Sequence, residues 1–476
     1  MPEVGFCPLL EDTQSVNHYV LLDFGSTFTK LSVVDRGLGA IVHTDRFPST
    51  VRTDAMICLG QCFDSARAVI GGEAFDRALK LSTSSAAGGL RMAVIGLSKT
   101  LSITAARNAA FGAGAKIVGS FVGELTPDDV RGLEGMDVEI ILFCGGYENG
   151  STKSLEHNAA MLAESGVSAP IIFAGNSKMD KVVRSILVNR NKTCYVVANI
   201  IPNVGSLDAK PTEEIIRHVF MASIINMKGL AKVQGVLDGP IVPTPAAVLS
   251  AGELLSMGAS EHEGMGPLMI VDVGGATTDI HSYVDQMPHE GARLMGTPEP
   301  FTRRTVEGDM GMRESSISLA EEIGWEVMAE KVGTDVNTLR DSVRRRVKTT
   351  NFVPETDLEK KIDHEIAAGA VHVSARRHSG RIRYIHASNH KAVQVGKNVS
   401  GVASVIGTGG PLVNSENPGA ILRNVCRIAA KETEVLLPDS VDLYLDRKYV
   451  FYAAGLLRPH DDNLAFTIMM DSMIRI

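Results

Sequence analysis

Residues 19–35 have the sequence YVLLDFGSTFTKLSVVD, and residues 269–283 have the sequence MIVDVGGATTDIHSY. Both stretches follow one plan: an apolar run that predicts a strand ends on an aspartate, a glycine follows two residues later, and a hydroxyl-rich turn leads into a second strand. When the two stretches are superposed, Asp23 meets Asp272. One copy lies in each half of the chain. We therefore expect two hairpins, one per lobe, that hold a nucleotide phosphate chain and its metal between them.

The residue types in both turns suit this chemistry. Glycines such as Gly25 and Gly274 let backbone N–H groups approach phosphate oxygens without a Cβ in the way. An aspartate at the end of a buried strand is costly unless it is paired or faces a cation, and a hydrated, nucleotide-bound Mg²⁺ supplies one. A single D-x-G step would indicate only an ordinary hairpin, whereas the matched pair favours a site. Further phosphate donors are the hydroxyls of Ser26, Thr27, Thr29, Thr277 and Thr278.

A third element follows in the sequence. Residues 401–406, GVASVI, predict a buried strand that leads into GTGGP at 407–411. A strand that ends in glycines lets the flat face of a ligand lie against the backbone. With two Asp-Gly hairpins and then this turn, the chain resembles the actin, Hsp70 and sugar-kinase superfamily. The resemblance implies a two-lobed α/β ATPase fold of duplicated RNase H-like domains, and it assigns the adenosine to Gly407, Thr408, Gly409 and Gly410.

The 476 residues are too many for one core and indicate two large domains or three modest ones. We expect lobe I over residues 1–240 and lobe II over residues 241–476. Small residues in predicted helices at 245–252 and 453–457 would let two interdomain helices cross closely. An inserted βαβ-type module is expected at about residues 115–200, where four apolar runs predict parallel strands: 115–121, 138–144, 170–173 and 194–200.

Composition excludes several classes of protein. A content of 44% hydrophobic and 21% charged residues is that of a soluble globular protein. Few aromatic residues and a net charge of −8 argue against a nucleic-acid partner. No apolar run approaches the roughly 18 residues that span a membrane, and the N-terminus lacks a secretory signal. Six cysteines in so long a chain do not form a disulfide framework, so a cytoplasmic protein is expected.

Three other segments carry charge or metal-binding side chains. Composition leaves open whether residues 303–313 line the site or form a solvated loop. The basic runs at 344–348 and 376–378 are interpreted as solvated faces. No metal site is expected at His386 and His390, because no further ligand pattern accompanies them.

A closer resemblance rests on longer motifs: SSAAGGLRM at residues 84–92, AAFGAGAK at 109–116 and RTVEGDMGMR at 304–313. With these motifs the chain resembles the glutamate mutase accessory proteins, the MutL family of mutase operons, over residues 20–457. The resemblance implies an ATP- and Mg²⁺-dependent, chaperone-like protein. Its partner would be an adenosylcobalamin-dependent mutase or aminomutase, which it reactivates or assembles. The particular mutase and the formation of homo-oligomers stay open.

The mechanism that the resemblance implies is electrostatic and conformational. Asp23 and Asp272 would hold Mg²⁺ through water, and Asp272 would orient the attacking water. Lys30 either contacts phosphate or points to solvent, and Asp279, which matches Lys30 in the superposition, would repel phosphate. The complete set of predicted phosphate ligands is Gly25, Ser26, Thr27, Thr29, Lys30, Gly274, Gly275, Thr277 and Thr278.

Two competing functions share this fold. A small-molecule kinase would need a carboxylate base in the cleft between the lobes, for which Glu307 or Asp309 are candidates. A non-catalytic nucleotide-sensing scaffold would need only the binding site. A phosphorylated product would identify the kinase, and sedimentation with and without ATP would identify a filament-forming scaffold.

Overall fold

The computed structural model describes residues 16–476 except 26–27, 52, 85–90, 100, 114, 149, 151, 204–205, 226–229, 276, 296–298, 350–351, 385–391 and 429–430. Its strands are β1 (His18–Phe24), β2 (Phe28–Asp35), β3 (Ala40–Pro48), β4 (Leu79–Ser84), β5 (Arg91–Gly96), β6 (Lys116–Val122), β7 (Ile140–Gly145), β8 (Ile171–Gly175), β9 (Cys194–Val196), β10 (Val242–Pro243), β11 (Gly258–Ala259), β12 (His262–Glu263), β13 (Leu268–Val273), β14 (Thr278–Tyr283), β15 (Ala292–Met295), β16 (Thr302–Glu307), β17 (Arg381–Tyr384), β18 (Ala392–Val395), β19 (Ser404–Thr408), β20 (Asp442–Asp446) and β21 (Met473–Arg475).

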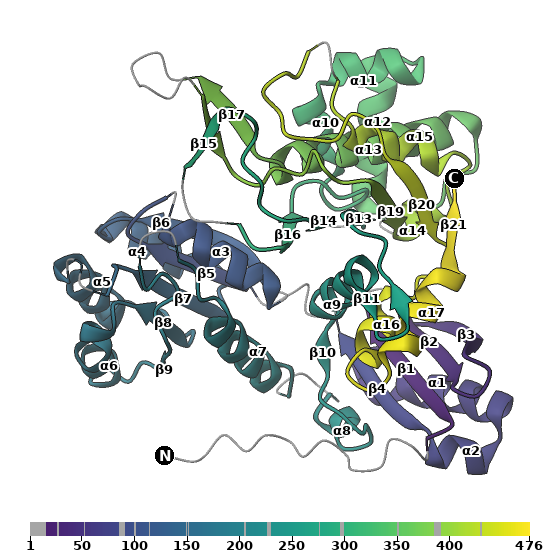
Figure 1. The fold of residues 1–476 in the computed structure, drawn as a ribbon, viewed down its shortest axis with the longest axis horizontal. Coiled ribbons are helices and arrows are strands. Elements are labelled where there is room, and N and C mark those ends of the chain that lie inside the picture. The colour runs from purple at the N-terminus through teal and green to yellow at the C-terminus, as the bar shows by residue number, and fades with distance from the viewer. Residues whose placement is uncertain are drawn as a thin grey trace.

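Helices connect and cover these strands (Figure 1). They are α1 (Ala55–Ile70), α2 (Gly72–Arg77), α3 (Ser102–Gly112), α4 (Pro127–Glu134), α5 (Lys153–Glu164), η2 (Ser177–Met179), α6 (Asp180–Val188), α7 (Lys210–Ile225), α8 (Leu230–Gln234), α9 (Thr244–Met257), α10 (Ser316–Ile323), α11 (Trp325–Val332), α12 (Val336–Lys348), α13 (Asp357–His378), α14 (Gly410–Val413), α15 (Pro418–Leu422), η3 (Arg423–Val425), α16 (Phe451–Leu457) and α17 (Asp462–Ser472).

Two of the sheets repeat one strand order. The sheet of lobe I runs β10-β4-β1-β2-β3, and the sheet of lobe II runs β16-β14-β13-β19-β20-β21. In both, three antiparallel strands are followed by two strands that join in parallel. Strand β1 thus corresponds to β13, β2 to β14 and β4 to β19. This duplication is the expected two-lobed, actin/Hsp70-like arrangement of RNase H-like domains.

The lobes meet along the helices α9 and α16. Tyr19 of β1 and Ile270 of β13 belong to one buried apolar cluster with side chains of both helices. A Cβ at Gly455 in α16 would overlap the carbonyl oxygen of Ala247 in α9. The helices therefore cross at backbone contact, as their small residues predict. Helix α16 is not the last element, because α17 and β21 follow it and β21 extends the sheet of lobe II.

Gly455→Ala is expected to destabilise the protein by about 1–3 kcal/mol, because the added methyl group forces two packed helices apart. The matched control is Gly60→Ala in α1, where a Cβ would meet no atom within 4 Å. In that exposed helical position alanine is expected to stabilise by roughly 0.5–1 kcal/mol. Thermal unfolding of both variants measures these effects. Equal unfolding midpoints for Gly455→Ala and Gly60→Ala would contradict the close crossing of α9 and α16.

A third sheet, with order β6-β5-β7-β8-β9, forms a module between β4 and α7, and all its strand pairs are parallel. One face packs with α3 and α7 and the other with α5 and α6, so both faces are buried. Figure 1 shows the module beside the two lobes, with α3 on the side that faces them. The parallel pairing of the four predicted runs is confirmed. Strand β5 was not predicted. The small residues at 82–89 predict a loop, but residues 82–84 belong to β4.

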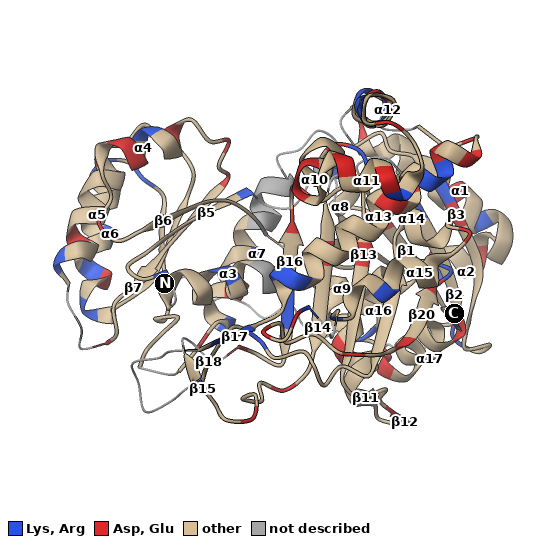
Figure 2. Cartoon of the chain, turned by 90° about the horizontal axis from the view of Figure 1, so that it is seen from above, with Lys and Arg blue, Asp and Glu red and all other residues tan. Residues whose placement is uncertain are grey.

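The charged residues are spread over the whole molecule (Figure 2). Figure 2 shows basic and acidic residues interspersed over the lobes and the module rather than gathered on separate faces. Within the described ranges, no helix combines the length and the apolar character that crossing a membrane requires.

Candidate functional site

The hairpins β1–β2 and β13–β14 have the same register. Asp23 pairs with Lys30, and Asp272 pairs with Asp279. Paired residues project from the same face of a sheet, so each hairpin presents two charged side chains together. The charges of Lys30 and Asp23 act on Asp272 across the cleft. The two predicted aspartates, one from each lobe, therefore lie near enough for the charge of Asp23 to raise the pKa of Asp272.

Both turns require glycine, because in each a carbonyl oxygen of the same turn lies too close to the backbone to leave room for a side chain. The amide of Gly25 donates to the carbonyl oxygen of Phe28 at 3.1 Å, and the amide of Gly274 donates to that of Thr277 at 2.9 Å. A Cβ would lie 2.6 Å from the first oxygen and 2.9 Å from the second. Any side chain would push the turns open.

Asp23 is fixed by residues that are distant in sequence. Its carboxylate is 1% exposed. Oδ1 accepts hydrogen bonds from the hydroxyls of Thr83 at 2.9 Å and Thr244 at 2.7 Å, and Oδ2 lies 3.3 Å from Nζ of Lys30. Thr83 belongs to β4 and Thr244 begins α9. The carboxylate is thus held rigidly before any ligand arrives.

Asp272 differs, because its carboxylate has no hydrogen-bond or ion-pair partner among the described residues. Desolvation of the partly buried group raises the pKa of Asp272 to about 7, and the negative charge of Asp279 adds to the shift. Gly409 closes one side: its φ is +95°, and a Cβ there would lie 2.6 Å from Oδ1 of Asp272. The second hairpin and the glycine turn therefore form one continuous surface around a carboxylate that lacks a cation.

Lys30 points into the cleft. Its Nζ contacts Asp23 and also lies 3.3 Å from the ring centre of Tyr449. The sequence left open whether Lys30 contacts phosphate or points to solvent. Its side chain is 31% exposed, and its ammonium is held by Asp23 and Tyr449 rather than directed only to solvent. Tyr449 was missed, because it stands in no motif and reaches the site from the turn between β20 and α16.

The hydroxyls of Thr29 and Thr278 face the cores of the lobes. Thr29 donates to Sγ of Cys58 at 3.2 Å, and Thr278 donates to the carbonyl oxygen of Met310 at 2.7 Å. Both threonines are fully buried. Alternation along a strand explains this, since each is adjacent to a residue that points into the cleft. The expectation that these hydroxyls face phosphate does not match the geometry.

Two further threonine hydroxyls have protein partners. Thr277 donates to Oδ2 of Asp279 at 3.1 Å, and Thr408 donates to Oδ2 of Asp446 at 3.2 Å. Burial raises the pKa of Asp446. These threonines brace acidic side chains around the cleft, which leaves their backbone amides as the groups that can meet a ligand.

The other predicted ligands are placed as follows. Gly275 is exposed at the second turn, and a Cβ there would meet no atom within 4 Å. Gly407 is buried in β19, and Gly410 is the first residue of α14. Ser26 and Thr27 lie outside the described residues.

Residues 303–313 line the site. The amide of Met312 donates to the carbonyl oxygen of Gly274 at 3.0 Å, and the amide of Arg313 donates to that of Gly275 at 2.8 Å. Residues 303–307 of this segment belong to β16, which pairs with β14, and residues 308–313 form the loop that follows it. The open question is therefore answered in favour of a loop that clamps the second turn.

Arg304 removes the expected repulsion at Asp279. Its Nε and Nη2 donate to Oδ1 of Asp279 at 2.9 and 2.6 Å. A charge-assisted pair of this kind neutralises the carboxylate and fixes its orientation.

The basic runs are only partly solvated. Arg346 is fully buried, and its Nε lies 2.6 Å from Oδ1 of Asp363. Arg376 is also buried, and its guanidinium contacts both carboxylate oxygens of Glu432. The interpretation of these two arginines as solvated was wrong, because a carboxylate from another segment pairs with each guanidinium and makes its burial tolerable.

A metal would have to rely on ligands besides protein side chains. Within the described ranges, no group of three or more His, Cys, Asp and Glu side chains is placed to hold a metal ion. His386 and His390 lie outside those ranges. Two carboxylates with phosphate and water suit Mg²⁺, which keeps several waters when it binds protein. The unpartnered carboxylate of Asp272 fits that requirement.

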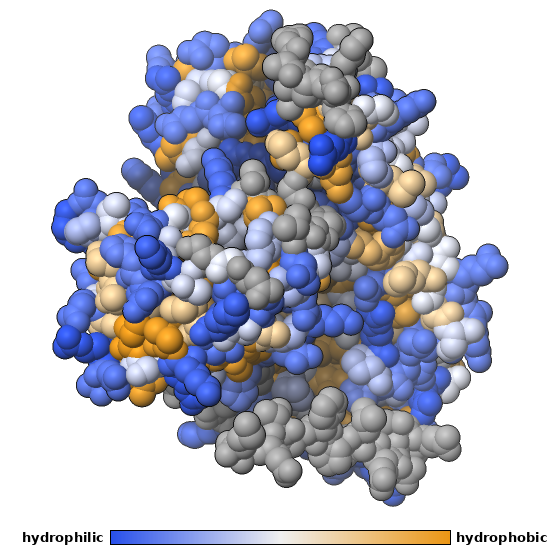
Figure 3. Space-filling model, turned by 60° about the vertical axis from the view of Figure 1, so that its left-hand side comes forward, coloured by the Kyte–Doolittle hydropathy of each residue, from blue (hydrophilic) through white to orange (hydrophobic). Residues whose placement is uncertain are grey.

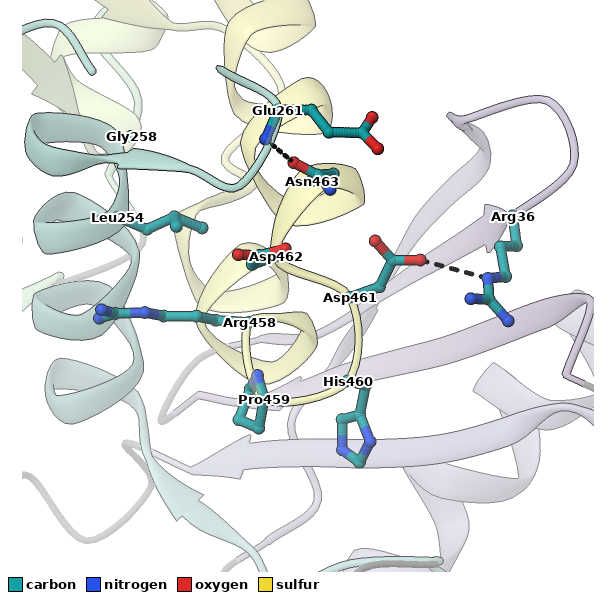
Figure 4. A pocket seen from close by; sticks show the side chains of 10 residues that line it. All are labelled: Arg36, Leu254, Gly258, Glu261, Arg458, Pro459, His460, Asp461, Asp462 and Asn463. Carbon is teal, nitrogen blue, oxygen red and sulfur yellow. Dashed lines mark hydrogen bonds and ion pairs between the residues drawn. The ribbon is translucent and has the colours of Figure 1, made fainter. Parts of the chain in front are cut away.

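A separate pocket of about 710 Å³ lies elsewhere (Figure 4). It is lined at the far end of β2 by Arg36 and at the end of α9 by Leu254, whereas the hairpin turn is at the start of β2. Polar groups in its lining pair with one another: Arg36 forms an ion pair with Asp461 at 3.2 Å, and the backbone amide of Glu261 donates to Oδ1 of Asn463 at 2.9 Å. It is not part of the hairpin site.

Thr83 and Thr244 are the supporting residues that sequence reasoning missed. Their signal was weak: Thr83 stood in a stretch taken for a loop, and Thr244 stood one residue before a predicted helix. Only the parallel pairing of β1 with β4 brings Thr83 beside Asp23.

Comparison with known proteins agrees with the motifs. The family model described as MutL protein matches residues 19–473. Protein MutL of Clostridium tetanomorphum is 37% identical over 460 residues, which cover 96% of this chain and 99% of that protein.

The solved structures that the chain matches are more distant in sequence. The ethanolamine utilization protein EutJ of Carboxydothermus hydrogenoformans is 11% identical, with a TM-score of 0.24 and coverage of 94% of this chain and 89% of that one. Xylulose kinase of Bifidobacterium adolescentis is 10% identical, with a TM-score of 0.32 and coverage of 94% and 92%. Such low scores say nothing about activity, and the fold assignment rests on the strand orders. On the family match and the relative of near-equal length, the chain belongs to the MutL protein family, the glutamate mutase accessory type that its motifs resemble.

Proposed function

We propose that this protein binds Mg²⁺ and ATP between its two hairpins and hydrolyses the nucleotide. The observation that carries the proposal is the unpartnered carboxylate of Asp272, enclosed opposite Asp23 and beside the glycine turns. An enclosed carboxylate without a partner is costly unless a cation joins it. The metal supplies charge neutralisation at the phosphates when it is bound.

The protein's own groups then have distinct roles. Asp23 is held at Oδ1 by two threonine hydroxyls, and its Oδ2, which Lys30 contacts, is the oxygen that would take part in holding the metal. Asp272 orients water. Lys30 and the backbone amide of Gly275 contact phosphate oxygens, Gly25 and Gly274 keep the two turns tight enough for the phosphates to approach, and residues 407–410 receive the adenosine. Such positioning and neutralisation account for most of the catalysis of phosphoryl transfer.

Calorimetry is expected to show ATP binding that depends on Mg²⁺, followed by slow release of phosphate. The physical reason is that without the metal the unpartnered carboxylate of Asp272 repels the phosphate chain of the nucleotide, whereas the carboxylates of Asp23 and Asp279 are already paired with Lys30 and Arg304. A titration with ATP and Mg²⁺ that shows no heat of binding would contradict the proposal.

We further propose that nucleotide-driven motion acts on an adenosylcobalamin-dependent mutase or aminomutase, which this protein reactivates or assembles. Family membership supports the class of partner. A contiguous path supports the coupling: the segment that clamps the second turn follows β16, and β16 contacts α3 of the module. Across that contact, Asn108 of α3 donates to Oε2 of Glu299 at 3.0 Å. Loss of a bridging phosphate would open the lobes and move this path.

The module offers a surface for such a partner. Figure 3 shows the side of the molecule on which the module lies as mainly hydrophilic, with apolar side chains in small separate patches. A partner that binds and leaves with each nucleotide cycle needs a surface of this mixed kind.

The division into lobes at 1–240 and 241–476 is retained as part of this proposal, with β10 completing the first sheet just past that boundary.

A small-molecule kinase is less well supported. Its candidate bases are both occupied, because Nη1 of Arg377 lies 3.0 Å from Glu307 and 2.8 Å from Asp309. A phosphorylated product from ATP and candidate sugars or acids would favour the kinase nevertheless. ATP-dependent sedimentation would favour a scaffold.

A further inference from the structure

Tyr449 has an unusual backbone conformation. Its φ is 56°, and Asn191 is the one other described residue besides glycines with positive φ. This region is disfavoured for a bulky side chain, and it persists where the surroundings dictate it. Asn191 lies in a surface turn, where asparagine is tolerated. Tyr449 lies between β20 and the interdomain helix α16, with its side chain in the cleft.

The surroundings of Tyr449 come from both lobes. Nζ of Lys30, from the first hairpin, lies 3.3 Å from the ring centre and 3.3 Å from Oδ2 of Asp23. The charge of Asp272, from the second hairpin, is the largest cause that raises the pKa of the Tyr449 hydroxyl. The ring also contacts Tyr452 with 6.3 Å between centroids. The ring of Tyr449 therefore contacts the ammonium of Lys30, and the charge of the unpartnered carboxylate acts on its hydroxyl.

We propose that Tyr449 is a positioning residue: its ring holds the Lys30 ammonium on Asp23 and keeps it off Asp272, so that Asp272 remains free for the metal. This inference rests on the proposed Mg²⁺–ATP site.

The alternative state of Lys30 makes the inference specific. A lysine has a flexible four-carbon stem and a compact charge, so it pairs readily with a nearby carboxylate. Asp272 is nearby, lacks a partner and already feels the charge of Lys30. Without the ring, only the ion pair with Asp23 holds the ammonium in place, and a Lys30–Asp272 pair that replaced it would compete with a divalent cation.

The experiment measures Mg²⁺-dependent ATP binding by calorimetry, independently of hydrolysis. Tyr449→Leu, which has no π face, is expected to weaken binding about tenfold, whereas Tyr449→Phe should stay within about twofold. Tyr449→Gly accepts φ 56° without strain and should behave like the leucine variant. The glycine variant keeps the test decisive if leucine at this φ impairs folding.

A double-mutant cycle identifies the route of the effect. If Tyr449 acts through Lys30, Tyr449→Leu should have no further effect on binding in a Lys30→Met background. An equal effect in both backgrounds, or a phenylalanine variant as weak as the leucine variant, would overturn the inference. Failure of the wild-type protein to bind Mg²⁺–ATP would instead refute the proposed function, so the two failures are distinguishable.

Discussion

Asp272→Asn is expected to reduce the turnover of ATP by at least about 100-fold, as does removal of one electrostatic stabiliser from other active sites. The amide has nearly the same shape but carries no charge, so it cannot neutralise a cation or orient water as a carboxylate does. Asp272 has no partner among the described residues that would lose a contact, so the fold should be unaffected. Phosphate release at saturating ATP and Mg²⁺, with circular dichroism on the same sample, measures both effects.

Asp23→Asn is expected to have a similar effect on turnover for the same reason. Asparagine keeps a carbonyl oxygen that can accept from Thr83 and Thr244, whereas alanine would leave two buried hydroxyls unsatisfied. That loss costs about 1–3 kcal/mol per group and would mix instability with catalysis. Glu73→Gln is the matched control, since its side chain is 81% exposed and pairs on the surface with Arg77. Wild-type turnover in both asparagine variants would show that these aspartates do not hold the metal.

Local patterns predicted the part of the site that each hairpin builds by itself. The superposition matches Asp23 with Asp272 and Lys30 with Asp279. The structure agrees, because Asp23 pairs with Lys30 in the first hairpin and Asp272 pairs with Asp279 at the same place in the second. A hairpin's register depends on its turn and its apolar alternation, both of which are local. The same alternation places the hydroxyls of Thr29 and Thr278 in the cores of the lobes. The sequence pattern therefore already argues against the prediction that these two hydroxyls contact phosphate.

Other features depend on contacts between distant segments. Thr83, Thr244 and Tyr449 reach the site through strand pairing and helix packing that no local pattern specifies. The burial of Arg346 likewise depends on Asp363 of another helix. A charged run predicts a solvated face only when no carboxylate from elsewhere meets it, and sequence alone does not show that meeting.

A cobalamin-dependent mutase or aminomutase that has lost activity during turnover is expected to recover when this protein, ATP, Mg²⁺ and fresh adenosylcobalamin are added. A damaged cofactor is held tightly in a closed partner, so its release needs binding energy from another source. Nucleotide supplies that energy only if the two nucleotide states bind the partner with different affinity. We expect a difference of at least about fivefold between ADP and a non-hydrolysable ATP analogue, measured by pull-down of the mutase.

The path from the site to the module gives this prediction a matched pair of variants. Asp272→Asn should retain the partner but fail to restore activity, because the nucleotide cycle stops. Asn108→Asp places a carboxylate beside Glu299 at the contact between α3 and β16 and should weaken that contact by charge repulsion. This variant should hydrolyse ATP like the wild type and yet lose most of the affinity difference, because the module no longer follows β16. If the mutase binds both nucleotide states equally and does not recover, the partner of this ATP site belongs to another class. If Asn108→Asp instead keeps the full difference, the partner senses the lobes directly and the module is not the element that transmits the change.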